Sequence, residues 1–136
     1  MGIGEPVLTL SGFARYEIDR EDFSENRNDE ELRRLLWFLL GGSRGGENRV
    51  RILSAIRSRP NNLNQLSRLL GIDYRSVQHH MGVLLKNSLV IGSGEKYGIV
   101  YSIHPWLHHH FATFELVCEK LGYSTNGVIL SASNSV

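Results

Sequence analysis

The chain has almost no cysteine, little proline and no long apolar run. Its 136 residues include one cysteine, Cys118, and three prolines. A single cysteine cannot form an internal disulfide framework and provides no Cys-rich metal motif, which favours a reducing cytosolic environment. No apolar stretch approaches the roughly 18 residues of a membrane-spanning helix, and the N-terminus has no signal-peptide pattern. We therefore expect a cytoplasmic protein with no membrane partner.

The usual sequence marks of an enzyme are also missing. The glycine-rich segment 41–46, GGSRGG, precedes a predicted helix, but it lacks the Lys-Ser/Thr pair of a phosphate-binding P-loop. No Ser/His/Asp set and no pair of carboxylates stands out, because most acidic residues gather near the N-terminus. The sequence therefore predicts neither an enzyme nor a cofactor.

The net charge of +1 hides a strong division along the chain. Residues 1–31 hold nine acidic residues against three arginines, a net charge of −6. Residues 32–104 hold eleven Lys and Arg against three acidic residues, a net charge of +8. A basic segment of this kind favours a polyanion partner. We divide the chain into an acidic, largely irregular arm at 1–28, a domain at 29–122 and a flexible C-terminal tail at 123–136.

Apolar periodicity and capping residues predict a mainly helical domain with one small hairpin. Asp29 is the expected N-cap of the first helix, and Asp73 is the expected N-cap of the fourth. One further strand is expected inside the acidic arm. The predicted helices cover 29–40, 47–58, 63–70, 74–87 and 105–121, the hairpin strands cover 90–92 and 99–103, and the strand of the arm covers 7–10.

The third and fourth predicted helices have the spacing of a helix-turn-helix. Small Ser67 lies four residues before Gly71, and Val77 lies six residues after it. A small side chain lets the helices approach, glycine adopts the positive φ of the turn, and the apolar residue anchors the second helix on the first. The hairpin VIGSGEKYGIVYSI then supplies a wing. These features predict a winged helix-turn-helix fold.

The fourth helix has an apolar face and a polar face. Val77, Met81 and Leu84 repeat at helical spacing and face the core. A polar outer face is typical of any surface helix, so the prediction of DNA binding also depends on the wing and the local positive charge. We expect base reading in the major groove by this helix, and backbone or minor-groove contact by the wing at 92–98. The predicted DNA-binding residues are Arg44, Arg49, Arg68, Arg75, Ser76, Gln78, His79, Lys86, Lys96 and Tyr97.

The run YRSVQHHMGVLLKNSLVIGSGEKYGIVYSI also follows a known pattern. The matching positions are Ser76, Val77, His79, His80, Met81, Leu84, Leu89, Val90, Tyr101 and Ile103. On these residues the segment 45–104 resembles the ArsR-type winged-helix repressors, whose recognition helix reads close to S-x-V-S-H-H-L-x-x-L-x-x-x-G-L-V. Gln78 and Ser88 replace the usual Ser and Gly, and MarR-type winged helices share much of the pattern. The resemblance implies a homodimeric transcription regulator whose recognition helices enter successive major grooves of double-stranded DNA.

Members of that family often bind metal, so the histidine-rich last helix is a candidate site. His104 and His108 are four residues apart, but Pro105 places His104 outside the helix. The predicted third helix lacks the cysteine pair of one family site, and the separated Asp and His pairs of the other are absent. We therefore expect no metal site.

The last predicted helix has a heptad pattern, with apolar residues that step alternately by four and three positions. Such a pattern favours pairing with a second copy or with the first helix of a partner chain. The first predicted helix is apolar nearly all round, which is typical of a helix buried on more than one side. The predicted homodimer interface consists of Leu32, Leu36, Leu39, Leu107, Phe111, Phe114, Cys118 and Leu121.

Two alternatives share this fold. A winged-helix module for protein contact in a transcription or chromatin assembly would present apolar or acidic residues on its fourth helix, and the acidic arm at 1–28 keeps this alternative open. A metal-responsive or small-molecule-responsive repressor would add an effector pocket between the first and last helices. The sequence does not define such a pocket or its effector.

Overall fold

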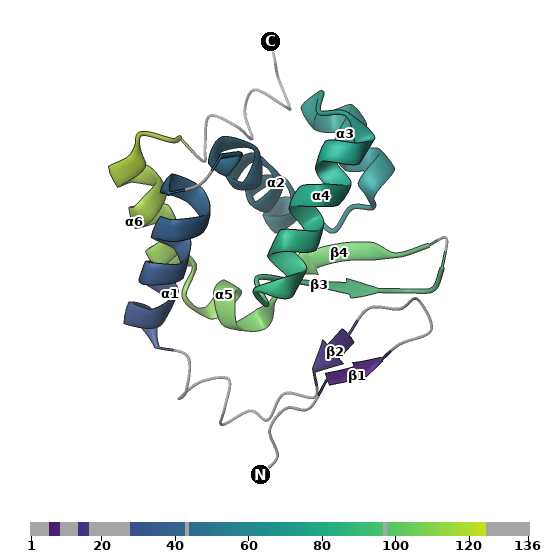
Figure 1. The fold of residues 1–136 in the computed structure, drawn as a ribbon, viewed down its shortest axis with the longest axis horizontal. Helices are drawn as coiled ribbons and strands as arrows, with labels where there is room; N and C mark the ends of the chain where they lie inside the picture. Colours follow the sequence, from purple (N-terminus) through teal and green to yellow (C-terminus); the bar gives the residue numbers. More distant parts are fainter. Residues whose placement is uncertain (1–5, 9–13, 17–27, 43, 97, 125–136) are drawn as a thin grey trace.

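Short helices and two antiparallel strand pairs make up the part of the chain that the computed structural model describes (Figure 1). That part comprises residues 6–8, 14–16, 28–42, 44–96 and 98–124. Its mainly helical character with a small hairpin confirms the predicted class. The elements are β1 (Pro6–Leu8), β2 (Ala14–Tyr16), α1 (Asp29–Leu36), the π-helical turn η2 (Trp37–Gly41), α2 (Gly46–Ser58), α3 (Leu63–Leu70), α4 (Tyr74–Lys86), β3 (Val90–Ser93), β4 (Val100–Ile103), α5 (Pro105–His109) and α6 (Phe111–Leu121).

The acidic arm contains more regular structure than the sequence predicts. Strands β1 and β2 pair antiparallel, with Pro6 opposite Tyr16 and Leu8 opposite Ala14. The first strand overlaps the predicted one, and the second was not predicted. The rest of the arm before Asn28 lies outside the described residues.

The N-cap of helix α1 lies one residue earlier in the chain than the sequence predicts. The N-cap is Asn28, whose Oδ1 accepts a hydrogen bond from the N–H of Glu31 at 2.9 Å, so Asp29 is the first helical residue. The prediction of Asp29 as N-cap was therefore wrong, because Asn and Asp satisfy the first-turn N–H groups equally well. After Leu36 the helix widens into η2, a π-helical turn, before it ends at Gly41.

Helices α3 and α4 and the turn between them agree with the prediction. Asn62 and Gln65 form a capping box at the start of α3. Gly71 ends α3 with φ of 67°, and Asp73 caps α4. The hydroxyl of Ser67 donates to the carbonyl oxygen of Ile72 at 2.6 Å, so the small residue also holds the turn.

The β3–β4 hairpin follows α4 directly and is joined to the helices at its base. Val90 pairs with Ile103 and Ser93 with Val100, close to the predicted strand bounds. A further bridge joins Asn61, between α2 and α3, to Tyr101 of β4. The hairpin therefore begins at the helices and extends away from them (Figure 1).

The predicted last helix is two helices that meet at His110. Helix α5 begins after His104, whose Nδ1 accepts from the N–H of Trp106 at 3.2 Å. His110 has φ of −113° and ψ of 32°, which interrupts the α-helical path before α6. Its side chain is held by Asp29 of α1, so a contact distant in sequence accompanies the break. Gly122 ends α6 with φ of 89°, as expected for a C-terminal glycine.

The residues predicted to form the dimer interface belong to the core of one chain. Helix α6 packs against α1 and η2 of the same chain. Helices α1 and α6 lie side by side in Figure 1. This placement corrects the predicted interface, because a face that the chain itself covers is not free for a second copy. Seven of the eight residues are buried, namely Leu32, Leu36, Leu39, Leu107, Phe111, Phe114 and Cys118, and Leu121 is half-buried.

The predicted C-terminal tail also begins later than residue 123. The hydroxyl of half-buried Tyr123 donates to the carbonyl oxygen of Leu40 at 3.3 Å, which fastens the end of α6 to η2. Residues 125–136 lie outside the described part.

Candidate nucleic-acid interface

Helix α4 is anchored by its apolar face, which leaves the opposite face to solvent. Val77, Met81 and Leu84 are each 1% exposed or less. At the start of the helix, a carboxylate oxygen of Asp73 accepts from the N–H of Ser76 at 3.2 Å. The side-chain hydroxyl of Ser76 and then its backbone N–H lower the pKa of Asp73, because both hydrogen bonds stabilise the charged carboxylate. Core packing thus holds the apolar face of α4, and the Asp73 cap holds its first turn.

The outer face of α4 carries most of the residues predicted to read DNA. Arg75, Gln78, His79 and Lys86 are exposed, and Ser76 is half-buried. Together these side chains provide guanidinium, amide, imidazole and ammonium groups on one continuous helix surface.

Gly82 leaves bare backbone in the middle of this outer face. A Cβ at this position would meet no other atom within 4 Å. No neighbouring helix of the described chain therefore requires a glycine here. The surface instead offers a place where a ligand can approach the helix backbone closely.

The hairpin adds a basic residue near its far end. Lys96 is exposed near the tip of the turn between β3 and β4, whereas Tyr97 lies outside the described residues. Gly94 has φ of 107°, and a Cβ there would lie 2.5 Å from the carbonyl oxygen of Gly98. The tight turn that presents Lys96 therefore requires glycine.

Three more arginines were predicted to contact phosphates, and they differ in exposure. Arg44 and Arg68 are exposed, as the prediction requires. Arg49 is 5% exposed, and its Nη1 donates to the carbonyl oxygen of Leu39 at 2.6 Å. Burial lowers the pKa of Arg49. The prediction for Arg49 was wrong, because its guanidinium joins η2 to α2 inside the chain.

Arg51 has a structural role that the sequence pattern did not reveal. Its Nη2 donates to the carbonyl oxygen of Leu70, the last residue of α3, at 2.6 Å. Its Nη1 donates to the side chain of Asn48 at 3.2 Å. Arg51 therefore positions the end of α3, and with it the turn into α4. A lone arginine in a helical pattern carries no signal of such a contact.

His80 lies between the outer face of α4 and the core. It is 7% exposed, and its ring packs edge-to-face against His79 with ring centroids 5.3 Å apart. Burial lowers the pKa of His80, and the nearby Arg49 and His79 lower it further. Among the described residues, its Nδ1 is buried without a hydrogen-bond partner. His80 is therefore a neutral, buried imidazole beside a basic surface.

The histidines in and around α5, namely His104, His108, His109 and His110, do not form a metal site in the part of the chain that the structure describes. Within the described residues, no three His, Cys, Asp or Glu side chains form a group that could hold a metal ion. Burial raises the pKa of the Cys118 thiol to about 12, which keeps it protonated and unsuited to metal binding.

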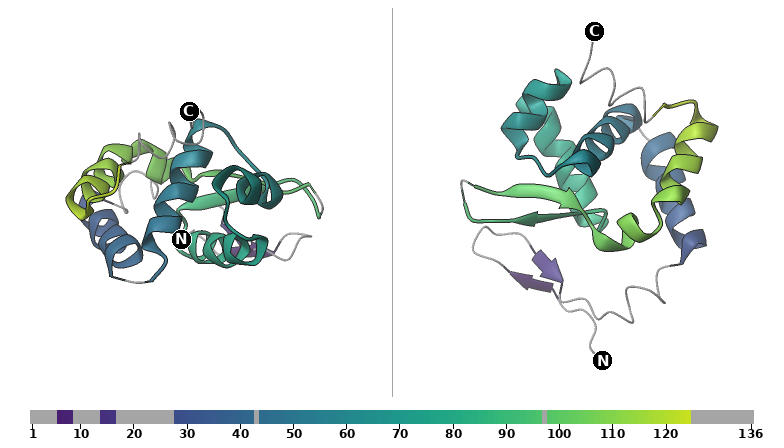
Figure 2. Two further views of the ribbon diagram at one scale, coloured as in Figure 1. Left: turned by 90° about the horizontal axis from the view of Figure 1, so that it is seen from above. Right: turned by 180° about the vertical axis from the view of Figure 1, so that it is seen from behind.

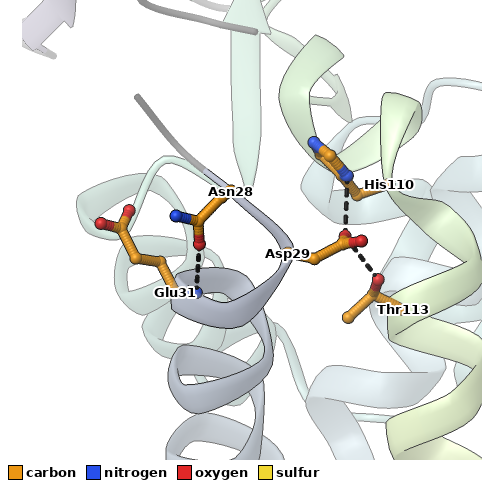
Figure 3. A network of polar contacts seen from close by, with 5 residues as sticks. All are labelled: Asn28, Asp29, Glu31, His110 and Thr113. Carbon is orange, nitrogen blue, oxygen red and sulfur yellow. Dashed lines mark hydrogen bonds and ion pairs between the residues drawn. The ribbon is translucent and has the colours of Figure 1, made fainter. Parts of the chain in front are cut away.

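One histidine of this region joins the two ends of the domain. Oδ1 of Asp29 accepts from the hydroxyl of Thr113 at 2.8 Å and lies 2.8 Å from Nδ1 of His110 (Figure 3). Asn28 caps α1 at the same place, which leaves the Asp29 carboxylate directed toward α6. The network fixes the start of α1 on the junction of α5 and α6.

No model of a known protein family matches the chain, and no curated protein matches it. None of the described helices combines the length and the apolar character needed to cross a membrane.

Proposed function

We propose that this chain binds double-stranded DNA sequence-specifically as a winged helix-turn-helix transcription regulator, similar to the ArsR-type repressors. The supporting observation is the outer face of α4, where Arg75, Gln78 and His79 are exposed. The opposite, apolar face of this helix is buried in the core. Arginine pairs through two hydrogen bonds with guanine, and glutamine does so with adenine. Helix α4 would then read the major groove.

Exposed cations on neighbouring elements would suit contacts with the phosphate backbone. Lys96 extends from the hairpin, Arg68 lies on α3, and Arg44 precedes α2, and all three are exposed. Contacts of this kind give affinity and position without reading sequence.

The experiment that tests the proposal is selection of bound duplexes from a random DNA library, followed by fluorescence anisotropy across a salt series. Enrichment of one motif, with affinity that falls steeply as salt rises, is expected. Parallel titrations with EDTA and with zinc test the metal-responsive alternative. Weak binding that is equal for all sequences would contradict sequence-specific regulation.

The homodimer is part of the same proposal, but it requires other residues than those the sequence indicated. Trp37, Phe38 and Leu116 are 38%, 62% and 44% exposed. They lie on η2 and α6, next to the covered core faces of the first and last helices. A second copy packed on these side chains would bury apolar surface and present two α4 helices to one operator.

A second candidate function is protein contact through the same fold. Leu69 at the end of α3 and Tyr74 at the start of α4 are 45% and 46% exposed, so an apolar patch adjoins the polar face. If the library selection enriches no motif, this patch becomes the surface to test, with Leu69→Asp as the disrupting variant.

A further inference from the structure

Gly82 is the only glycine of helix α4, and the described part of the chain does not explain its presence. It is the ninth of 13 helical residues, where glycine is less favourable than alanine. Its φ is not positive, in contrast to that of Gly71, so the backbone would accept other residues. A Cβ built on it would meet no described atom within 4 Å, so no helix packing requires its absence. A local choice that disfavours the helix without serving the fold is expected at a functional position.

Gly82 lies at the centre of the outer face of α4. Gln78 is one turn before it and Lys86 one turn after it, and both are exposed. Arg75 is exposed two turns before it, and α4 contains no Asp or Glu. Seen from above, α4 lies along one edge of the molecule, with α2 and α3 on its inner side (Figure 2). The bare position is therefore flanked by groups that suit DNA.

The surface at Gly82 itself is apolar, although its neighbours are polar. In an α-helix only the first four N–H groups and the last four C=O groups lack a partner within the helix. Gly82 belongs to neither set, so its backbone has no free donor for a phosphate oxygen. What remains exposed is the Cα methylene, with no side chain beyond it. A small apolar group therefore suits this position better than a charged one.

We propose that Gly82 receives the 5-methyl group of a thymine in the DNA that α4 binds. This contact rests on the proposed DNA binding and adds one base to what the helix reads. The thymine methyl is the apolar group that base edges present in the major groove, and small apolar groups of proteins contact it. Because glycine has no Cβ, the helix can approach this methyl group more closely here than at any other position of its outer face.

Helix geometry also places this thymine relative to the base that Gln78 contacts. Gly82 lies four residues after Gln78, which is about 6 Å along the helix axis. Stacked base pairs are about 3.4 Å apart. Where α4 follows the groove, the thymine lies within about two base pairs of the pair that Gln78 contacts.

The first test removes the methyl group from the DNA. A motif is selected from a random library, and each of its thymines is replaced in turn by deoxyuridine, which lacks only the 5-methyl group. Fluorescence anisotropy measures the affinity of the full-length protein for each duplex. We expect replacement of the thymine that faces Gly82 to weaken binding about fourfold, the contribution of one buried methyl group. The other thymines of the same duplex serve as controls and should tolerate the replacement.

Gly82→Ala tests the protein side of the same contact. Its Cβ would occupy the place of the thymine methyl, so we expect weaker binding to the thymine duplex and a smaller loss with deoxyuridine at the sensitive position. The preference for the methyl group should then disappear. Lys86→Ala is the matched control, because it removes a cation from the same face and should weaken binding to both duplexes alike. Thermal unfolding of both variants checks that the fold is kept.

NMR of the complex locates the contact directly. We expect a nuclear Overhauser effect between the α-protons of Gly82 and the methyl protons of the thymine that the deoxyuridine series identifies. The same effect at another residue of α4, and none at Gly82, would overturn the assignment.

The outcomes separate the thymine contact from DNA binding as a whole. A selected motif that has no thymine, or that tolerates every deoxyuridine, would overturn the contact and keep the DNA function. A methyl preference that Gly82→Ala leaves unchanged would place the methyl group elsewhere and would also overturn the contact alone. Failure of the library to yield any motif would overturn both.

Discussion

The carboxylate of Asp29 receives the hydroxyl of Thr113 and the ring nitrogen of His110 at the same oxygen, each at 2.8 Å. Asp29 begins the first helix of the domain, and His110 separates the last two. One side chain thus joins segments from opposite ends of the described domain. In a chain with a core this small, such a contact contributes to the position of α6 on α1.

Asp29→Asn tests this contact. The variant weakens the interactions with His110 and Thr113, so we expect the free energy of unfolding to fall by about 1 kcal/mol. Glu30→Gln is the control, because it removes the same charge from the same helix turn but only breaks an exposed ion pair with Arg34 at 3.6 Å. Urea unfolding of both variants measures the difference. Equal losses would show that the helix dipole, and not the network, accounts for the effect.

The buried ring of His80 predicts a dependence of stability on pH. Its pKa in the folded chain is lowered from the ordinary value of 6.5, so the unfolded chain binds more protons at mildly acidic pH. The stabilising contribution is complete above pH 6.5 and is lost as the pH falls toward the lowered folded value. We expect the free energy of unfolding to decrease less between pH 7.5 and 5 in His80→Gln than in the unmodified chain. Exposed His108→Gln on α5 should keep the original dependence, and a parallel change in both variants would refute the assignment to His80.

Arg75 and Lys96 should differ in kind as DNA contacts. Arg75→Ala should weaken binding to the selected motif by about 1–3 kcal/mol and affect random DNA little, because it removes base reading. Lys96→Ala should weaken binding to all sequences alike. Anisotropy with the selected duplex and a scrambled duplex measures both, and Lys120→Ala on α6 serves as the charge-matched control. Equal losses on both duplexes for Arg75→Ala would remove it from the reading residues.

Phe38 offers a test of self-association. Its side chain is 62% exposed, so Phe38→Asp should leave the fold intact while it disrupts an apolar interface. Sedimentation velocity should then show a dimer for the unmodified chain and a monomer for the variant. Leu69→Asp places the same charge on an exposed leucine of α3 and should remain dimeric. A monomeric unmodified chain would end the homodimer proposal.

Two glycines of the proposed DNA-binding unit should respond oppositely to alanine. Gly71 has φ of 67°, so Gly71→Ala strains the turn and should cost about 1 kcal/mol of stability. Gly82 lies in the helical interior of α4 with open space around it, so Gly82→Ala should stabilise by up to about 1 kcal/mol. Thermal unfolding measures both. Weaker DNA binding by the more stable Gly82→Ala variant would indicate that DNA approaches the backbone at this point.

The unit from α3 to β4 was predictable because its signals are local. Asp73 caps α4, Gly71 supplies the positive φ that the turn requires, and the apolar residues of α4 follow one helical period. Each of these signals spans a few residues and does not depend on distant segments. The exposed positions of Arg75 and Lys86 follow from the same period.

The first and last helices were harder because their partners lie far away in sequence. A spacing of four and three residues shows that Phe111 and Phe114 face an apolar partner, but it does not show which chain supplies that partner. The carbonyl oxygen of Leu39 that binds Arg49, and the carboxylate of Asp29 that binds His110, are equally invisible in local sequence. Tertiary contacts therefore decided the points at which the prediction failed.

The bridge between Asn61 and Tyr101 holds the β3–β4 hairpin at one end and leaves its other end without this support. Two backbone hydrogen bonds, at 3.2 and 2.9 Å, fix its root to the connection between α2 and α3, while the end that carries Lys96 extends away from the helices. Bending of the free end would move Lys96, while these hydrogen bonds hold the root of the hairpin in place. The chain can adapt to the contour of a surface with one element while another keeps a constant orientation.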